Sequence, residues 1–201
     1  MKRALIVIDV QESFRQRPTW AAMSNPDIAA QVGRLVDAAR ACGDLVVWVL
    51  HSEPGTGTPF DPVAGHVRLI DGLERRDGEP VIVKTSVNAF TTTNLQQTLM
   101  TAGVRDLVIC GIRTEQCCET TARVGSDLGF GVTFVTDATT TSAIPAPDAP
   151  ADQTAAELLS DPRALRAEDL IERTERVLAA RGFATIATTQ EIVAAAEVLA
   201  R

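Results

Sequence analysis

Short apolar runs alternate with helical patterns along the chain, and this alternation constrains the fold more than any other feature. Each run is rich in β-branched residues and lacks the apolar/polar alternation of a strand with one wet face, which is typical of strands buried on both faces. Parallel strands need crossover connections, and helices provide them. We therefore predict an α/β fold, a three-layer α/β/α arrangement around a mostly parallel, six-stranded sheet. The apolar runs are 4–8, 45–50, 81–83, 107–110, 132–135 and 183–187.

The segments between the runs carry their own signals. Asn25 and Pro26 predict an N-cap and a first helical turn, and Gly43 predicts the end of that helix. The proline-rich stretches 51–79 and 142–151 predict irregular connections, which in compact domains are often functional. A length of 201 residues suits a single domain covering 1–201.

Composition excludes several classes of function. The net charge is −7, and no run of Lys and Arg exceeds two residues, so a nucleic-acid partner is not expected. No apolar stretch reaches the about 18 residues that span a bilayer, so no membrane partner is expected either. The four cysteines include no CxxC pair, which favours a cytoplasmic protein with reduced thiols. With only two histidines and no tyrosine, histidine-centred catalysis is nearly excluded.

The ends of the predicted strands bring chemical groups to one edge of the sheet. In open α/β sheets, ligands bind beyond the carboxyl ends of the strands, where the strand order reverses. The groups found there are Asp9, His51, Lys84, the segment 111–117 and Asp137.

A carboxylate, an ammonium group and a thiol at this edge form a workable nucleophilic site. Cys117 falls in the first turn of a predicted helix, where the helix dipole favours a thiolate. Asp9 could accept the thiol proton, while Lys84 would stabilise the negative charge. Taken singly, the same residues could be a strand-end cap, a solvated lysine and a small core residue.

Three motifs resemble the isochorismatase-like cysteine hydrolases, a superfamily that includes nicotinamidases, N-carbamoylsarcosine amidases and ureidoacrylate hydrolases. They are ALIVIDVQ at 4–11, KTSVNAF at 84–90 and GIRTEQCCETTAR at 111–123, and the likeness spans roughly residues 4 to 190. The resemblance implies Cys117 as nucleophile, Asp9 as general base and Lys84 as the third member of a triad. It also implies a cis peptide bond between Ile112 and Arg113, with the backbone N–H groups of Arg113 and Cys117 forming an oxyanion hole.

Two departures narrow the function. Nicotinamidases carry Asp-x-His and a further His as metal ligands, whereas this chain has His51-Ser52-Glu53 and then His66, so we expect no metal and no cofactor. True isochorismatases, which hydrolyse a vinyl ether, tend to lack the cysteine. Cys117 therefore favours cleavage of a C–N bond in a small molecule.

The leading hypothesis is an amidase-like hydrolase that forms a thioester on Cys117. A vinyl-ether hydrolase on the same fold is the alternative within the family. A thiol redox sensor that uses the adjacent Cys117 and Cys118 comes from a different class, as does a catalytically silent binding module.

The residues that would shape the substrate pocket are less well defined. The segments 52–68 and 145–150 are expected to border it, and aromatic residues could equally be core or oligomer contacts. The relatives' assembly favours a homo-oligomer, either a dimer or a tetramer. The pocket candidates are Phe14, Trp20, His51, Phe60 and Phe90.

Overall fold

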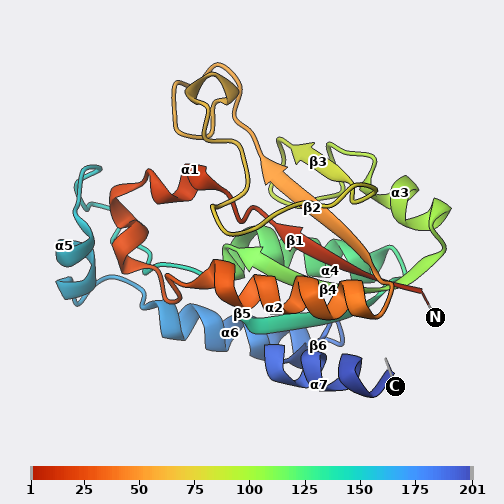
Figure 1. Cartoon of the computed structure of the whole chain (residues 1–201). Helices are drawn as coiled ribbons and strands as arrows, with labels where there is room; N and C mark the ends of the chain where they lie inside the picture. The colour runs from red at the N-terminus through yellow and green to blue at the C-terminus, as the bar shows by residue number, and fades with distance from the viewer. Residues whose placement is uncertain (1, 200–201) are drawn as a thin grey trace.

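The computed structural model describes residues 2–199, and its centre is a six-stranded sheet in which every pair of neighbours is parallel. The strand order is β3-β2-β1-β4-β5-β6, and helices pack on both faces (Figure 1). The predicted α/β class with a parallel six-stranded sheet is therefore confirmed. The strands are β1 (Lys2–Ile8), β2 (Leu45–His51), β3 (Val81–Lys84), β4 (Val104–Ile112), β5 (Gly131–Thr140) and β6 (Thr185–Ala187).

The helices form two layers around this sheet. One face packs against α3, α4 and α6, and the other packs against α2 and α7. The short helices α1 and α5, with the 3₁₀ turn η1, gather at one end of the molecule, where α5 contacts η1 (Figure 1). The α-helices are α1 (Glu12–Arg15), α2 (Ile28–Ala41), α3 (Leu95–Thr101), α4 (Glu119–Asp127), α5 (Ala155–Ser160), α6 (Ala167–Ala180) and α7 (Thr189–Leu199). The turns are η1 (Pro18–Ala22), η2 (Pro62–Ala64) and the π-helical η3 (Thr114–Cys118).

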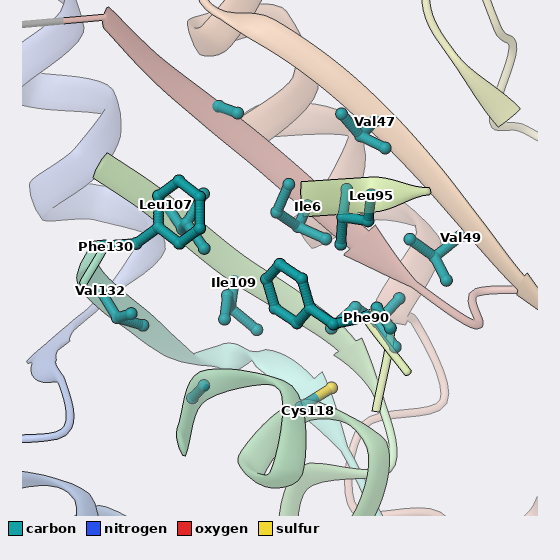
Figure 2. Close-up of a cluster of buried hydrophobic side chains, with 14 of the residues drawn as sticks. Ile6, Val47, Val49, Phe90, Leu95, Leu107, Ile109, Cys118, Phe130 and Val132 are labelled. Atoms are coloured by element: carbon teal, nitrogen blue, oxygen red, sulfur yellow. The ribbon is translucent and has the colours of Figure 1, made fainter. Parts of the chain in front are cut away.

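The continuous apolar runs arise because both faces of the central strands are covered. Within β1, Ile6 belongs to the core under α3 and α4, whereas Leu5 and Val7 belong to the core under α2. Figure 2 shows the core under α3 and α4, in which Phe90 and Cys118 lie among side chains of β1, β2 and β4. Burial of these large side chains supplies most of the driving force for folding.

Strand register brings the predicted site residues together. His51 pairs with Lys84 at the ends of β2 and β3, and Ile8 pairs with Gly111 across β1 and β4. The chain order reverses between β1 and β4, so this is the point where a parallel sheet opens a crevice. At Gly111, φ is +131°, and an added Cβ would stand 1.9 Å from the Ile8 carbonyl oxygen. Only glycine allows β4 to approach β1 so closely.

Several local predictions were wrong. The helix predicted from Asn25 and Pro26 begins at Ile28, because Asn25 instead accepts a hydrogen bond from the Asp27 N–H in a tight turn. β4 and β5 are longer than their apolar cores, since backbone pairing with neighbours continues through polar residues. Asp137 lies within β5 and its carboxylate accepts bonds from Thr189 at the start of α7, away from the site.

Three short elements could not be predicted from the sequence. α1, η1 and α5 are too short to show helical periodicity. In the described part of the chain, no helix is both long and apolar enough to cross a bilayer.

Candidate active site

The residues predicted as a triad meet at the carboxyl end of the sheet. Asp9 directly follows β1, Lys84 ends β3, and Cys117 lies in η3 after β4. Lys84 Nζ is 2.8 Å from Asp9 Oδ2 and 3.4 Å from Cys117 Sγ, and both charged side chains are fully buried. The ammonium group thus bridges the carboxylate and the thiol.

Backbone conformation aims the carboxylate at this point. Asp9 has φ 54°, the left-handed region in which aspartate is more tolerated than most residues. Its N–H donates to the Val49 carbonyl, and its own carbonyl accepts from Gln11 N–H. The chain therefore turns sharply at the end of β1.

Burial sets the protonation of the site. It raises the pKa of Asp9, an effect that the nearby Lys84 ammonium and Cys117 thiol oppose. Burial, reinforced by the Asp9 charge and opposed by Lys84, raises the pKa of Cys117 to about 12. The predicted thiolate at a helix start is therefore wrong, because burial and the Asp9 charge favour the thiol. The resting nucleophile is a thiol beside a carboxylate of raised basicity.

His51 extends this arrangement beyond the three residues. Its Nδ1 is 3.3 Å from Lys84 Nζ, and its Nε2 is 3.3 Å from Glu53 Oε1. Burial and the Lys84 charge lower the pKa of His51, against the opposing effects of Asp9 and Glu53. A neutral ring that accepts from Lys84 and donates to Glu53 satisfies both contacts.

The turn that carries the nucleophile contains a cis peptide bond and is held by several hydrogen bonds. The peptide bond between Ile112 and Arg113, where the resemblance places a cis bond, is cis. The Arg113 carbonyl accepts bonds from the N–H groups of Gln116 and Cys118, and the N–H of Cys117, which lies between them, is not one of these donors. A bond between the Thr114 and Thr139 hydroxyls, 2.8 Å long, anchors η3 to β5.

A cavity of about 660 Å³ opens above Asp9 and Cys117. Three predicted pocket residues line it, namely Phe14, His51 and Phe60, with the Phe14 and Phe60 rings edge to face. The prediction for Trp20 and Phe90 is wrong, since neither is among the described residues that line the cavity. Trp20 packs against the core under α2, and Phe90 stacks on Phe130 in the opposite core (Figure 2).

Several polar residues of the site have no signal in spacing or composition. Arg17 and Glu53 line the cavity from loops, and Ser142 contributes from the segment after β5. Gln11 is fully buried and exchanges two hydrogen bonds with the His51 backbone, its Oε1 accepting and its Nε2 donating. Its position as the last residue of the motif at 4–11, two residues after Asp9, was the available hint.

The adjacent cysteines occupy different environments. Cys117 borders the cavity, whereas Cys118 is fully buried in the core of Figure 2, where burial raises its pKa. Both are free thiols. A core position for Cys118 does not favour a sensor that uses the two thiols together.

His51 and Glu53, at and just after the end of β2 where nicotinamidases carry metal ligands, are not arranged to bind a metal ion. His51 Nδ1 faces the Lys84 ammonium, and both Glu53 oxygens are engaged, one with His51 and one with the Thr58 hydroxyl. Within residues 2–199 no three His, Cys, Asp or Glu side chains are arranged to hold a metal ion.

Comparison with known proteins agrees with this geometry. The family model described as "Isochorismatase domain" matches residues 3–163. A streptothricin hydrolase of Streptomyces noursei is 36% identical over 147 residues, covering 72% of this chain and 56% of its own length. A ureidoacrylate amidohydrolase, RutB of Klebsiella pneumoniae, is 26% identical over 170 residues, covering 68% of this chain and 72% of its own.

Solved structures give the same result. An isochorismatase from Pseudomonas putida KT2440 is 33% identical with a TM-score of 0.78, covering 94% of this chain and 89% of its own. A hydrolase of the isochorismatase family from Chromobacterium violaceum has a TM-score of 0.83 at 24% identity, covering 98% and 94% of the two chains. By sequence and by fold, this chain belongs to the isochorismatase family of hydrolases.

Proposed function

We propose that this protein hydrolyses a C–N bond of a small molecule, of amide, ureido or lactam type, through a thioester on Cys117. The observation that carries the proposal is the single Lys84 ammonium group that bridges the buried Asp9 carboxylate and the Cys117 thiol at the floor of a cavity. Two relatives, a ureidoacrylate amidohydrolase and a streptothricin hydrolase, support hydrolysis of this general kind.

The proposed reaction uses Asp9 as the only proton carrier. Asp9 takes the thiol proton as Cys117 Sγ attacks the substrate carbonyl carbon, and the backbone N–H groups of Arg113 and Cys117 hold the oxyanion. The C–N bond then breaks, and protonated Asp9 gives its proton to the departing nitrogen. Water attacks the thioester, Asp9 takes a proton from that water, and the proton returns to the sulfur as the acid leaves.

Lys84 balances charge throughout this cycle. Its ammonium group touches both the carboxylate and the sulfur, so it stabilises whichever of them is negative. His51 and the Ser86 carbonyl, 3.3 Å and 3.1 Å from Nζ, hold the ammonium in place. No histidine needs to transfer a proton, which agrees with the scarcity of this residue.

The test is a panel of primary amides, ureido acids and small lactams with ammonia or amine release as the readout. Intact-mass measurement on quenched reactions would show an acyl adduct, and peptide mapping would place it on Cys117. Cys117→Ala should abolish both signals. Turnover by Cys117→Ala at the wild-type rate, or hydrolysis of a vinyl ether with no amide turned over, would overturn the proposal.

A further inference from the structure

Two arginines line the cavity without a carboxylate partner. Arg113 follows β4 at the nucleophile turn, and Arg17 lies between α1 and η1. Within residues 2–199 neither guanidinium group forms a salt bridge. Arg17 is exposed and Arg113 is half-buried. Each guanidinium group carries five N–H donors and a permanent charge, so both can bind an anion that enters the cavity.

Arg113 is held in place but not neutralised. Its Nη1 donates to the Ser142 hydroxyl at 2.8 Å, which leaves its other donors without a partner among the described residues. Burial lowers the pKa of Arg113, as does the charge of Arg17, while Glu115 opposes this without forming a salt bridge. Both arginines line the same cavity, so the two guanidinium groups border a common space.

Arg17 is held by aromatic rings. Its guanidinium carbon lies 4.8 Å from the centroid of Phe60 and 5.9 Å from that of Phe14. A guanidinium group with its face on a ring keeps its edge free, and the edge carries the N–H donors that bind a carboxylate in bidentate fashion.

The acidic groups of the cavity cannot supply the missing negative charge. Asp9 is paired with Lys84, and Glu53 is engaged by His51 and by Thr58. The rest of the outer wall is mostly apolar, formed by alanines and prolines between 143 and 151 and by Leu158. Glu115, which acts on Arg113, does not line the cavity. The cavity therefore offers two guanidinium groups that no carboxylate of its lining pairs with, over a site that attacks a carbonyl.

We infer that Arg113 and Arg17 form an anion-binding subsite, and that the substrate is a short amide or ureido acid whose carboxylate lies between the two guanidinium groups. The amide or ureido part of this inference rests on the proposed hydrolase function, whereas the carboxylate part does not. The same residue, Arg113, would then contact the substrate twice, through its backbone at the carbonyl that is cleaved and through its side chain at the carboxylate.

Kinetics on a matched substrate pair test the subsite. Succinamate and its methyl ester differ only in the carboxylate charge and one methyl group. We expect kcat/KM for the acid to exceed that for the ester by at least about 10-fold, the scale of a partly buried charge-assisted contact. Arg113→Gln should remove this preference, mainly through KM, and Arg17→Gln should reduce it at least about threefold.

Arg15→Gln is the matched control for charge. Arg15 lies two positions from Arg17, pairs with Glu12 and does not line the cavity, so its loss should leave the acid-to-ester ratio unchanged. An equal or greater preference for the ester in the wild type would overturn the inference, as would an acid preference that survives in Arg113→Gln.

A binding measurement separates this inference from the proposed reaction. Succinate and dimethyl succinate are titrated by calorimetry into Cys117→Ser, and into Cys117→Ser that also carries Arg113→Gln. We expect succinate to bind the first protein at least about 10-fold more tightly than the second, with an affinity that falls as salt rises. If no amide is cleaved but this pattern appears, the proposed hydrolase function fails and the anion subsite stands. Equal succinate affinity in both proteins would overturn the subsite, whatever the kinetics show.

Discussion

The two ends of the sheet each contain a buried carboxylate paired with a cation, and the two pairs are built differently. At the carboxyl end, Asp9 faces Lys84, and neither Asp9 oxygen receives a hydrogen bond from a backbone or arginine N–H within residues 2–199. Near the start of β3, Glu79 pairs with Arg40 and accepts one further bond each from the Trp48 ring and the Arg76 N–H.

The number of donors decides what each carboxylate does. Burial alone would raise the pKa of Glu79, but bonds from Arg40, the Arg76 N–H and Trp48 outweigh it and lower the pKa to about 2. For Asp9, burial is the larger effect and raises the pKa. A carboxylate surrounded by donors keeps its charge and stabilises the fold, whereas a carboxylate with few donors is ready to accept a proton.

Removing the base should produce the largest effect on catalysis. In Asp9→Asn we expect kcat on any accepted amide to fall about 10³-fold, because general-base catalysis is lost while the thiol remains. The variant should also lose stability, since Lys84 is left buried without its partner. Adding Lys84→Met should recover stability in urea denaturation without recovering activity. Activity within tenfold of wild type would contradict the role of Asp9.

The thiol should titrate far above its usual range. Because the pKa of Cys117 is raised from 9.0 to about 12, the group is protonated below that pH and the thiolate fraction at neutral pH is reduced roughly a thousandfold. The alkylation rate of Cys117 by iodoacetamide is the rate of the wild type minus the rate of Cys117→Ala. This difference should rise tenfold per pH unit from 7 to 10 without a plateau. A plateau below pH 9 would show a resting thiolate instead.

Glu79→Gln should affect stability but not catalysis. We expect the free energy of unfolding at pH 7 to fall by about 2 kcal/mol, because buried donors from Arg40 lose a charged acceptor. The measured kcat/KM should stay within about twofold of wild type. Asp77→Asn is the control, since this carboxylate is fully exposed and its loss should change neither quantity.

The stability difference between wild type and Glu79→Gln should also depend on pH. The folded pKa of Glu79 is depressed from 4.5 to about 2, so its contribution is fully present above 4.5 and is lost as pH falls toward 2. Urea denaturation at pH 7, 4 and 3 should show the two proteins converging in stability. A constant difference across this range would mean that the charge of Glu79 does not matter.

The smallest expected effect belongs to Cys118→Ala. This side chain is fully buried in the core of Figure 2, and its truncation should cost about 1 kcal/mol of stability while leaving activity within about twofold. Exposure to mild peroxide, followed by counting free thiols, should show no coupled loss of the two cysteines in wild type. A thiol sensor would show that coupled loss.

Much of the catalytic floor could be predicted from the sequence, for a physical reason. Parallel strands buried on both faces leave a strong apolar signature, and the residues directly after such strands must share one edge of the sheet. Asp9, Lys84 and Cys117 follow from that rule once the strands are found. Their contacts depend on where each strand ends, and the end of each apolar run in the sequence marks that position approximately.

The cavity wall could not be predicted in the same way. Arg17 and Ser142 sit on irregular segments whose path depends on tertiary contacts, and neither has a local pattern. Aromatic residues illustrate the difficulty, since Phe60 borders the cavity and Phe90 does not, although both are buried and both lie in irregular segments. The protonation of Cys117 was likewise misjudged, because burial and a neighbouring charge are properties of the assembled site.

The outer wall of the cavity comes from the connection between β5 and α6, which lies outside the sheet and contacts η1 through α5. Strand pairing does not depend on it, so the sheet and this outer wall are separable parts of the molecule. Libraries confined to residues 143–158 can therefore explore new substrates while the reactive floor stays constant.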